Sequence, residues 1–203
     1  MYIPKYFKVT NEDEIREFIQ LNSFGTLVTT KKGRPIATHL PMQLVQKEAL
    51  YITGHMAYGN PQWRTFETAE EVLVMFQGPH AYVSSSWYEH ENVPTWNYQA
   101  VHIYGKASIL SDKELEQDLQ RLLHKYENHR ETPILWEKLS PVLLEKELKG
   151  IVGFKIKVEE IQAAYKLSQN RNEKDYQNII EELHNEKDIN AKALAEIMKN
   201  REK

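Results

Sequence analysis

Alternation of apolar and polar residues dominates the first half of the chain. Side chains that alternate in this way point to opposite faces of a β-strand, so that one face is buried and the other is solvated. Turn signals such as Lys31-Lys32-Gly33-Arg34-Pro35 separate the alternating segments. The pattern predicts antiparallel strands at residues 24–30, 36–45, 49–53, 71–77 with a continuation at 80–83, 96–110 and 151–158. The segment 96–110 is predicted to be the longest of them.

Helical signals flank and interrupt these strands. Thr10 followed by Asp13 is close to a capping box, so we expect a helix from there to about residue 22. Ser111 with Glu114 is a full capping box, and the helix after it carries apolar residues on one face: Leu115, Leu119, Leu122, Leu123 and Tyr126. Further helices are predicted from Asn60-Pro61 to about 67, from Ser140-Pro141 to Gly150, at 172–185 and at 190–200.

Strands with inserted helices predict a mainly β fold of the α+β class, an antiparallel β-barrel decorated by helices. A closed barrel leaves no exposed strand edge. We expect a barrel domain at residues 1–165 with a helical insertion at about 111–150, followed by a C-terminal loop and helical tail at 166–203. Loops are predicted at 54–59 and 84–94, and the second is rich in tryptophan and tyrosine.

Composition narrows the chemistry that such a fold can carry. The 203 residues include no cysteine, which excludes disulfides, thiolate nucleophiles and Cys-ligated metal sites, so a redox role would need a bound cofactor. The 26 Lys+Arg and 29 Asp+Glu give a net charge of −3, which argues against a simple basic nucleic-acid clamp. No apolar run approaches the about 18 residues of a membrane helix, and the N-terminus lacks the apolar core of a signal peptide. We therefore expect a cytoplasmic protein without membrane contact.

Motifs for the common catalytic and phosphate sites are missing from the sequence. There is no HExxH, GxSxG, GxGxxG or Walker loop. None of the eight histidines lies four residues from another, so we expect no metal site.

Three segments place hydroxyl, imidazole, amide or indole groups beside a predicted strand end: 37–41, 51–57 continuing into 60–63, and 94–98 continuing into 101–105. A ligand with an aromatic plane and an anionic tail needs such a mixture of flat apolar walls and polar donors. The alternative is that the tryptophans belong to the core and the small residues only shape turns. The pattern alone leaves both interpretations open.

The blocks that carry a family resemblance run in order through nearly the whole chain. They are Met1-Tyr2-Ile3-Pro4, Gly25-Thr26-Leu27-Val28, Ala37-Thr38-His39-Leu40-Pro41, Gly54-His55-Met56-Ala57 with Asn60-Pro61-Gln62-Trp63, residues 93–98 with 101–105, and Lys166-Leu167-Ser168-Gln169-Asn170-Arg171. With these blocks the sequence resembles the PaiB family of FMN-binding negative transcriptional regulators. That family lies in the flavin-binding split-barrel group that also holds pyridoxamine-phosphate oxidase.

The resemblance implies a split β-barrel that forms a homodimer with FMN at the subunit interface. It places phosphate contacts on Thr53, Gly54 and His55 with Thr38 on the adjoining strand, and it places Trp96 and Asn97 near the flavin ring. It also implies a late polar loop at the cofactor, formed by Lys166, Gln169, Asn170 and Arg171. The oxidases of the group carry a Ser-Arg-Lys cluster after the strand, whereas this chain has His55-Met56-Ala57-Tyr58, whose sole candidate cation is His55.

The resemblance implies a repressor of sporulation and degradative-enzyme (protease) synthesis genes. Two alternatives stay open: a small FMN-dependent oxidoreductase, for which only His55 and His102 stand out as acid or base, and a flavin-free interaction module. Direct DNA binding has weak support, because the basic and acidic residues of the tail largely cancel: Lys187, Lys192, Lys199, Arg201 and Lys203 against Glu186, Asp188, Glu196 and Glu202.

Overall fold

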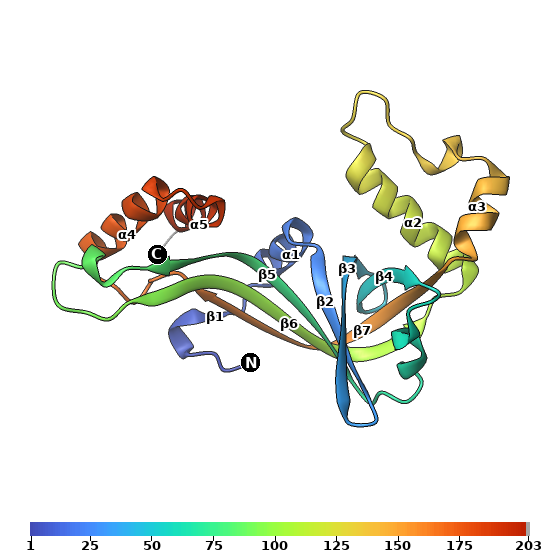
Figure 1. Cartoon of the computed structure of the whole chain (residues 1–203), viewed down its shortest axis with the longest axis horizontal. Helices are drawn as coiled ribbons and strands as arrows, with labels where there is room; N and C mark the ends of the chain where they lie inside the picture. Colours follow the sequence, from blue (N-terminus) through green and yellow to red (C-terminus); the bar gives the residue numbers. More distant parts are fainter. Residues whose placement is uncertain (202–203) are drawn as a thin grey trace. The chain divides into compact units, whose positions relative to one another are not determined.

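The computed structural model describes residues 1–201 and contains seven strands and five α-helices within them (Figure 1). The strands are β1 (Lys8–Val9), β2 (Phe24–Lys31), β3 (Arg34–Gln46), β4 (Leu50–Ala57), β5 (Val72–Val83), β6 (Thr95–Ile109) and β7 (Ile151–Lys166). The α-helices are α1 (Glu12–Leu21), α2 (Asp112–Glu127), α3 (Pro141–Leu148), α4 (Glu173–Asn185) and α5 (Ile189–Asn200). Short 3-10 helices are η1 (Lys5–Phe7), η2 (Pro61–Thr65), η3 (Ser85–Trp87) and η4 (Trp136–Lys138). Two of the tail charges considered above, Glu202 and Lys203, lie outside the described residues.

The strands form one sheet that closes on itself. Their order is β1-β7-β4-β3-β2-β5-β6, and a further pairing joins β7 to β6. The pairings with an assigned register, β1–β7, β2–β3, β2–β5, β3–β4 and β4–β7, are antiparallel. Six strands therefore make a ring, which confirms the expected α+β split barrel.

The chain packs as two compact units, and neither is a continuous segment. Unit 1 comprises Met1–Phe18, Phe76–His102 and Gln162–Lys203, and unit 2 comprises Ile19–Met75 and Ile103–Ile161. Strands β5, β6 and β7 each contribute residues to both units. The expected boundary after residue 165 divides the chain along the sequence, and it stays a prediction.

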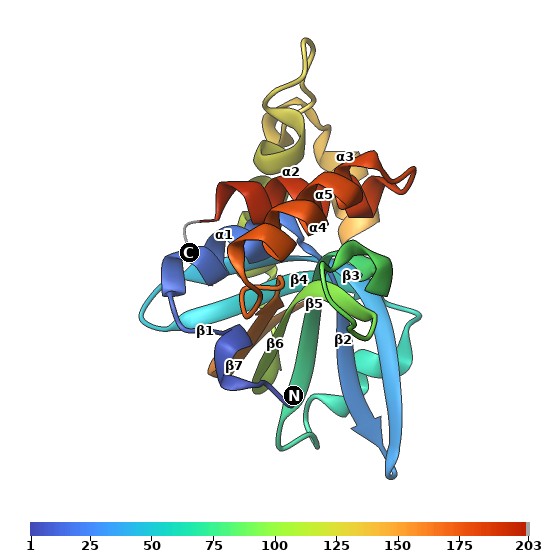
Figure 2. The same cartoon turned by 90° about the vertical axis from the view of Figure 1, so that its left-hand side faces the viewer.

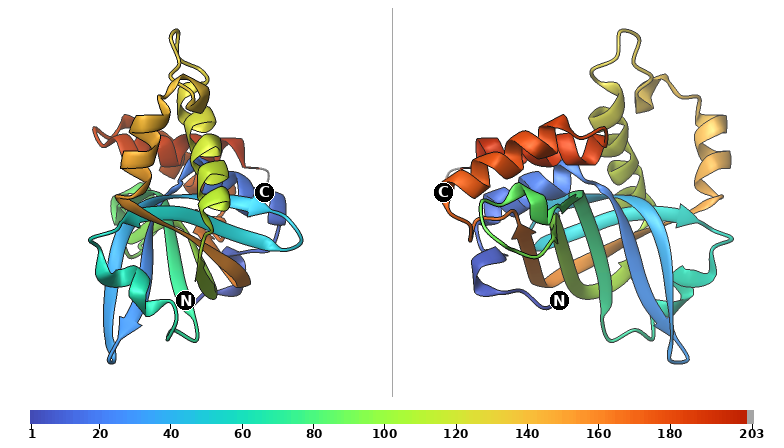
Figure 3. Two further views of the ribbon diagram at one scale, coloured as in Figure 1. Left: turned by 90° about the vertical axis from the view of Figure 1, so that its right-hand side faces the viewer. Right: turned by 60° about the vertical axis from the view of Figure 1, so that its left-hand side comes forward.

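Unit 2 holds the core of the barrel. Ile52, Ile103 and Phe154 have no exposed surface, and the rings of Phe66 and Phe154 pack with centroids 5.7 Å apart. The β2–β3 hairpin turns at Lys32 and Gly33, whose φ angles of 50° and 78° match the left-handed backbone of a type I′ turn (Figure 3).

The closure of the barrel depends on a glycine in β6. A Cβ atom on Gly105 would lie 2.0 Å from the backbone oxygen of Lys157 in β7. The alternation of β6 puts this position on its buried face, between Ile103 and the half-buried Ala107. Only glycine lets the two backbones approach so closely.

Unit 1 includes the helical hairpin of α4 and α5, which lie side by side in Figure 2. The Tyr176 hydroxyl of α4 donates to the backbone oxygen of Met198 in α5 at 2.9 Å. Ile179 and Leu194, one from each helix, are fully buried. Asn172 and Asp188 cap the two helices, so both predicted tail helices are confirmed.

Several predicted boundaries are wrong. Asn11, rather than Thr10, caps α1, because its side chain accepts from the backbone N–H groups of Asp13 and Glu14. Strand β7 has 16 residues and runs to Lys166 instead of ending near 158, so it exceeds the 15 residues of β6. Residues 54–57 continue β4 instead of forming a loop, because they pair with residues 151–154 of β7.

Within residues 1–201, the structure contains no helix with the length and apolar character needed to span a bilayer.

Candidate functional site

The site residues predicted from the sequence fall into two groups, one in each unit. Unit 2 holds the proposed phosphate contacts, Thr38, Thr53, Gly54 and His55. Unit 1 holds Trp96, Asn97, Lys166, Gln169, Asn170 and Arg171.

The Thr38 hydroxyl is part of a polar network within unit 2. It donates to Gln62 Oε1 at 2.5 Å and accepts from Asn60 Nδ2 at 3.0 Å. The other end of the Gln62 amide donates to the backbone oxygen of Leu27 at 3.0 Å. Asn60 also caps η2, as the sequence predicted. The network anchors η2 to strands β2 and β3. Because the Thr38 hydroxyl donates its hydrogen to Gln62, it has no hydrogen left to donate to a phosphate.

Thr53 meets a carboxylate that sequence reasoning missed. Its hydroxyl donates to Asp118 Oδ1 of α2 at 2.5 Å, and Arg121 Nη2 donates to the same oxygen at 2.8 Å. The Gln43 amide donates to the Asp118 backbone oxygen at 3.1 Å. Both Thr53 and Asp118 are buried, so this cluster fastens α2 to the sheet. The available signal was the spacing of Asp118, which follows the buried Leu115 by three residues and therefore lies on the inner face of its helix.

Gly54 lies inside β4, opposite Phe154. A Cβ atom there would approach the Phe154 ring at 3.0 Å and the Pro41 backbone oxygen at 3.1 Å. Close packing therefore accounts for a glycine at this position, and its contact with a phosphate stays a prediction.

His55 is half-buried two residues after Thr53, on the same face of β4. Burial lowers the pKa of its imidazole below 6.5, and the nearby Asp118 carboxylate opposes this shift only in part. The ring is thus neutral at pH 7 and supplies no positive charge.

This direction of shift gives a testable pH dependence. The unfolded chain binds a proton at His55 near pH 6.5, whereas the folded chain binds it only at lower pH, so stability is complete above about 6.5 and falls as the pH drops towards the folded value. We expect His55→Gln to reduce the loss of stability between about pH 7 and about pH 5.5. Urea unfolding at about pH 7 and at about pH 5.5 measures this loss of stability. Part of the loss should remain, because burial also lowers the pKa of His102. Substitution of the exposed His129 by glutamine is the control, and an equal effect of both substitutions would contradict the assignment.

In unit 1, two cations lie close together. Lys166 Nζ donates to the Thr95 hydroxyl and lies 5.9 Å from the centre of the Phe7 ring. Burial, and then the positive charge of Arg171, lower the pKa of Lys166. The Arg171 guanidinium lies 4.8 Å from the centre of the Tyr88 ring. Within the described residues, neither cation makes an ion pair. Two uncompensated cations beside aromatic rings are a suitable environment for a phosphate group.

The neighbouring polar residues shape the loop that carries Arg171. The Gln169 amide accepts from the Leu167 backbone N–H at 2.7 Å and donates to the Tyr165 backbone oxygen at 2.7 Å. Asn97 has no exposed surface, and its amide bonds with the Ser168 hydroxyl through both its nitrogen and its oxygen. Asn97 therefore supports this loop, and its place near a flavin ring stays a prediction. Asn170 is exposed and stays a candidate.

Trp96 belongs to an exposed aromatic row on β5 and β6. Its side chain is 54% exposed, and its ring centroid lies 6.1 Å from that of Tyr82 and 6.2 Å from that of His80. Thr95 and Trp96 are consecutive in a strand, so their side chains point to opposite faces. The aromatic row and the Lys166–Arg171 pair are thus separate features of unit 1.

Comparison with known proteins assigns the family. Residues 1–160 match the domain family described as "Putative FMN-binding domain". The chain is 70% identical over 202 residues to "Protease synthase and sporulation protein PAI 2" of Bacillus subtilis (strain 168), which covers 99% of this chain and 98% of that protein. The chain belongs to the PaiB family.

The chain is also similar to more distant proteins. An uncharacterized protein of Aspergillus fumigatus is 29% identical over 234 residues, which covers 89% of this chain and 90% of that protein. The flavocytochrome Anf3 from Azotobacter vinelandii superposes with a TM-score of 0.65 at 14% identity, covering 87% of this chain and 78% of its own. The FAD and heme binding protein from Mycobacterium smegmatis superposes with a TM-score of 0.60 at 14% identity, covering 78% of this chain and 73% of its own. At these identities the two structures establish the fold alone.

The two groups of residues differ in how they fit the FMN that the PaiB family name implies. In unit 2, Thr38 and Thr53 already donate their hydroxyl hydrogens to Gln62 and Asp118, and the neutral imidazole of His55 adds no positive charge, so the predicted contacts by themselves lack the cation that an FMN phosphate needs. In unit 1, Lys166 and Arg171 fit a phosphate, and the exposed ring of Trp96 fits a planar ring system.

Proposed function

We propose that this protein is a negative transcriptional regulator of the PaiB type, which lowers expression of sporulation and degradative-enzyme genes as a homodimer that binds FMN. The observation that carries the proposal is the 70% identity to the PAI 2 protein over nearly the full length of both chains. Identity at that level leaves few places where the function could have diverged.

Homodimer formation is supported by the aromatic row on unit 1. Trp96 and Tyr82 are 54% and 48% exposed and are in contact with each other. Neighbouring exposed aromatic side chains commonly mark a protein interface or a ligand site. Sedimentation of the purified protein at micromolar concentration should give the mass of two chains, and a monomer would contradict this part of the proposal.

FMN binding is supported by the chemistry of the unit 1 groups. When bound, a flavin supplies reversible two-electron redox chemistry, and the chain has no cysteine pair that could do so. Lys166 and Arg171 would hold the phosphate, and Trp96 would cover the ring. Because these groups lie on opposite faces of β6, a single copy offers them on separate surfaces. A cofactor shared by two copies would bring both features to one ligand.

Neutralising the cationic pair should weaken FMN binding. We expect Lys166→Gln and Arg171→Gln each to raise the Kd for FMN about tenfold or more, because a charge-assisted contact contributes roughly 1.5–3 kcal/mol. Quenching of FMN fluorescence during titration measures the Kd. Lys187→Gln, at an exposed position of the same unit, is the matched control. Equal Kd values for all three variants would exclude the pair as the phosphate site.

The regulatory role needs a test in cells and a test with DNA. Deleting the gene should raise expression of a reporter driven by a secreted-protease promoter, and unchanged expression would contradict the repressor assignment. Gel-shift titration at several salt concentrations then separates direct from indirect action. With a net charge of −3, we expect weak binding with a shallow salt dependence, as in regulation through a partner. Rapid bleaching of bound flavin by reduced nicotinamide under anaerobic conditions would instead favour the oxidoreductase alternative.

A further inference from the structure

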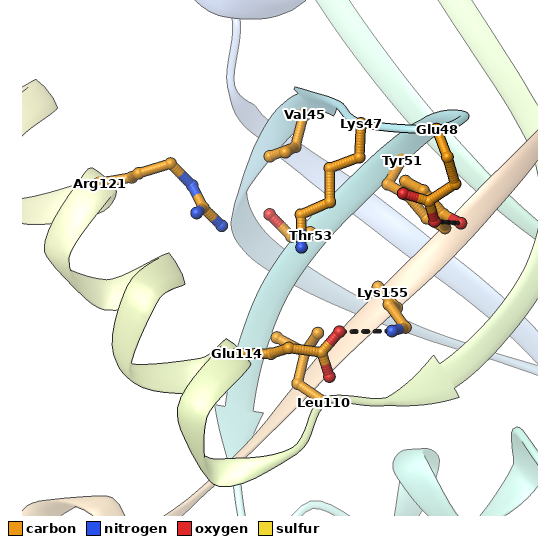
Figure 4. Close-up of a pocket in the computed structure, with 9 residues that line it drawn as sticks. All are labelled: Val45, Lys47, Glu48, Tyr51, Thr53, Leu110, Glu114, Arg121 and Lys155. Carbon is orange, nitrogen blue, oxygen red and sulfur yellow. Dashed lines mark hydrogen bonds and ion pairs between the residues drawn. The ribbon is translucent and has the colours of Figure 1, made fainter.

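Unit 2 contains a polar pocket that the proposed regulator and its flavin do not use. It has a volume of about 180 Å³ and lies between the β3–β4 turn, α2 and β7 (Figure 4). Its walls combine three cations, two carboxylates and four other residues: Lys47, Arg121, Lys155, Glu48, Glu114, Val45, Tyr51, Thr53 and Leu110. A volume of this size admits a small metabolite but not a dinucleotide.

The carboxylates of this pocket already have partners. Glu114 accepts from Lys155 Nζ at 2.6 Å and from the Ser111 hydroxyl at 2.9 Å. These contacts, led by the bond from Lys155, lower the pKa of Glu114 to about 2. Glu48 accepts from the Tyr51 hydroxyl at 2.6 Å. Both acids are therefore ionised at neutral pH and are held by groups of the protein.

The hydrogen-bond donors of two cations are not used up in the same way. Arg121 gives one nitrogen, Nη2, to Asp118, whereas its Nε is buried without a hydrogen-bond partner among residues 1–201. Lys47 makes no ion pair or side-chain hydrogen bond with the described residues. Figure 4 shows the guanidinium and the Lys47 ammonium both directed towards Thr53, from opposite walls of the pocket. The Arg121 side chain is 39% exposed and bonds to Asp118 through Nη2, so an anion between the two heads would accept from the exposed part of the guanidinium and from the Lys47 ammonium.

We propose that this pocket binds a small carboxylate or phosphate anion between the Arg121 guanidinium and Lys47 Nζ. The Glu114–Lys155 pair forms a further wall of the pocket and limits the size of the ligand. Leu110 and Val45 would contact the apolar part of the ligand. Arg121 also bonds to Asp118, which fixes α2 on Thr53, so occupancy of the pocket would tighten α2 against the sheet. Such a site gives the protein a small-molecule input that is independent of flavin binding.

The test uses full-length ¹⁵N-labelled protein, with inorganic phosphate and succinate as separate probes at constant ionic strength set by chloride. We expect a saturable shift of the Arg121 Nε–H resonance with at least one probe in the millimolar range. Saturation by phosphate alone identifies a phosphate ligand, saturation by succinate alone a carboxylate, and both together a general anion site. No saturable shift with either probe would overturn the proposal.

Variants locate the anion. Lys47→Gln removes no ion pair or side-chain hydrogen bond with the described residues, so it should fold normally and bind the effective probe about tenfold more weakly. Lys113→Gln, an exposed position of α2 outside the pocket, is the matched control and should bind like the wild type. Equal weakening by both variants would indicate a nonspecific charge effect and would also overturn the proposal.

Discussion

Replacing Gly105 by alanine is expected to destabilise the fold severely. The new Cβ would lie 2.0 Å from the Lys157 backbone oxygen, which cannot move aside as a side-chain end could. Relief requires a shift of β6 against β7, the pair that closes the barrel. We expect a loss of roughly 3 kcal/mol or more in the free energy of unfolding, measured by urea denaturation.

Gly59→Ala is the matched control for this substitution. A Cβ atom at Gly59 meets nothing within 4 Å, and its φ lies outside the left-handed region. This variant should unfold within about 0.5 kcal/mol of the wild type. Equal stabilities for the two variants would show that β6 and β7 are not held at the close approach described above.

Replacing Asp175 by alanine is expected to loosen the 84–94 loop on α4 around Glu89, while Asn178 still bonds to the Trp87 backbone oxygen. The Asp175 carboxylate has no exposed surface and accepts from the Glu89 backbone N–H at 3.0 Å and from the Asn172 amide at 2.8 Å. His90 Nδ1 lies 3.5 Å from the same carboxylate. Removal takes a charged acceptor away from two partly buried hydrogen bonds, so we expect a loss of about 2–4 kcal/mol.

Hydrogen exchange and urea unfolding together measure this effect. The Glu89 amide should exchange much faster in Asp175→Ala, because its acceptor is gone. Asp175→Asn keeps one acceptor oxygen and should lie between the alanine variant and the wild type. Asp13→Ala, at an exposed position of α1, controls for the loss of an acidic residue. Unchanged protection of Glu89 would contradict the assigned contact.

Local chemistry made several elements predictable from the sequence. The Ser111–Glu114 capping box forms as predicted, with both of its reciprocal bonds. Asn60 and Ser140 cap their helices, each followed by a proline. These capping signals depend on residues within four positions of each other, so the local sequence is enough to predict where such helices begin. The fold class followed in the same way from strand alternation.

The sequence does not show the surroundings of a residue whose partners are distant along the chain. Gly54 looks like a loop residue next to His55, but its surroundings are set by Phe154 and Met42 on neighbouring strands. Thr53 resembles a phosphate contact until Asp118 is placed beside it. Asn97 presents the same problem, because Ser168 occupies its amide. For such residues the sequence shows a polar side chain, and only the fold shows whether that side chain bonds to another residue of the chain.

The discontinuity of unit 1 has a consequence for synthesis on the ribosome. Lys8 and Val9 of β1 pair with Ala164 and Ala163, which are translated only after most of the chain has emerged. The apolar side chains near the N-terminus therefore stay without their native packing partners during most of elongation. Nascent chains that stop before β7 is complete would expose these side chains, and we expect such chains to be the main clients of chaperones and proteases during production of this protein.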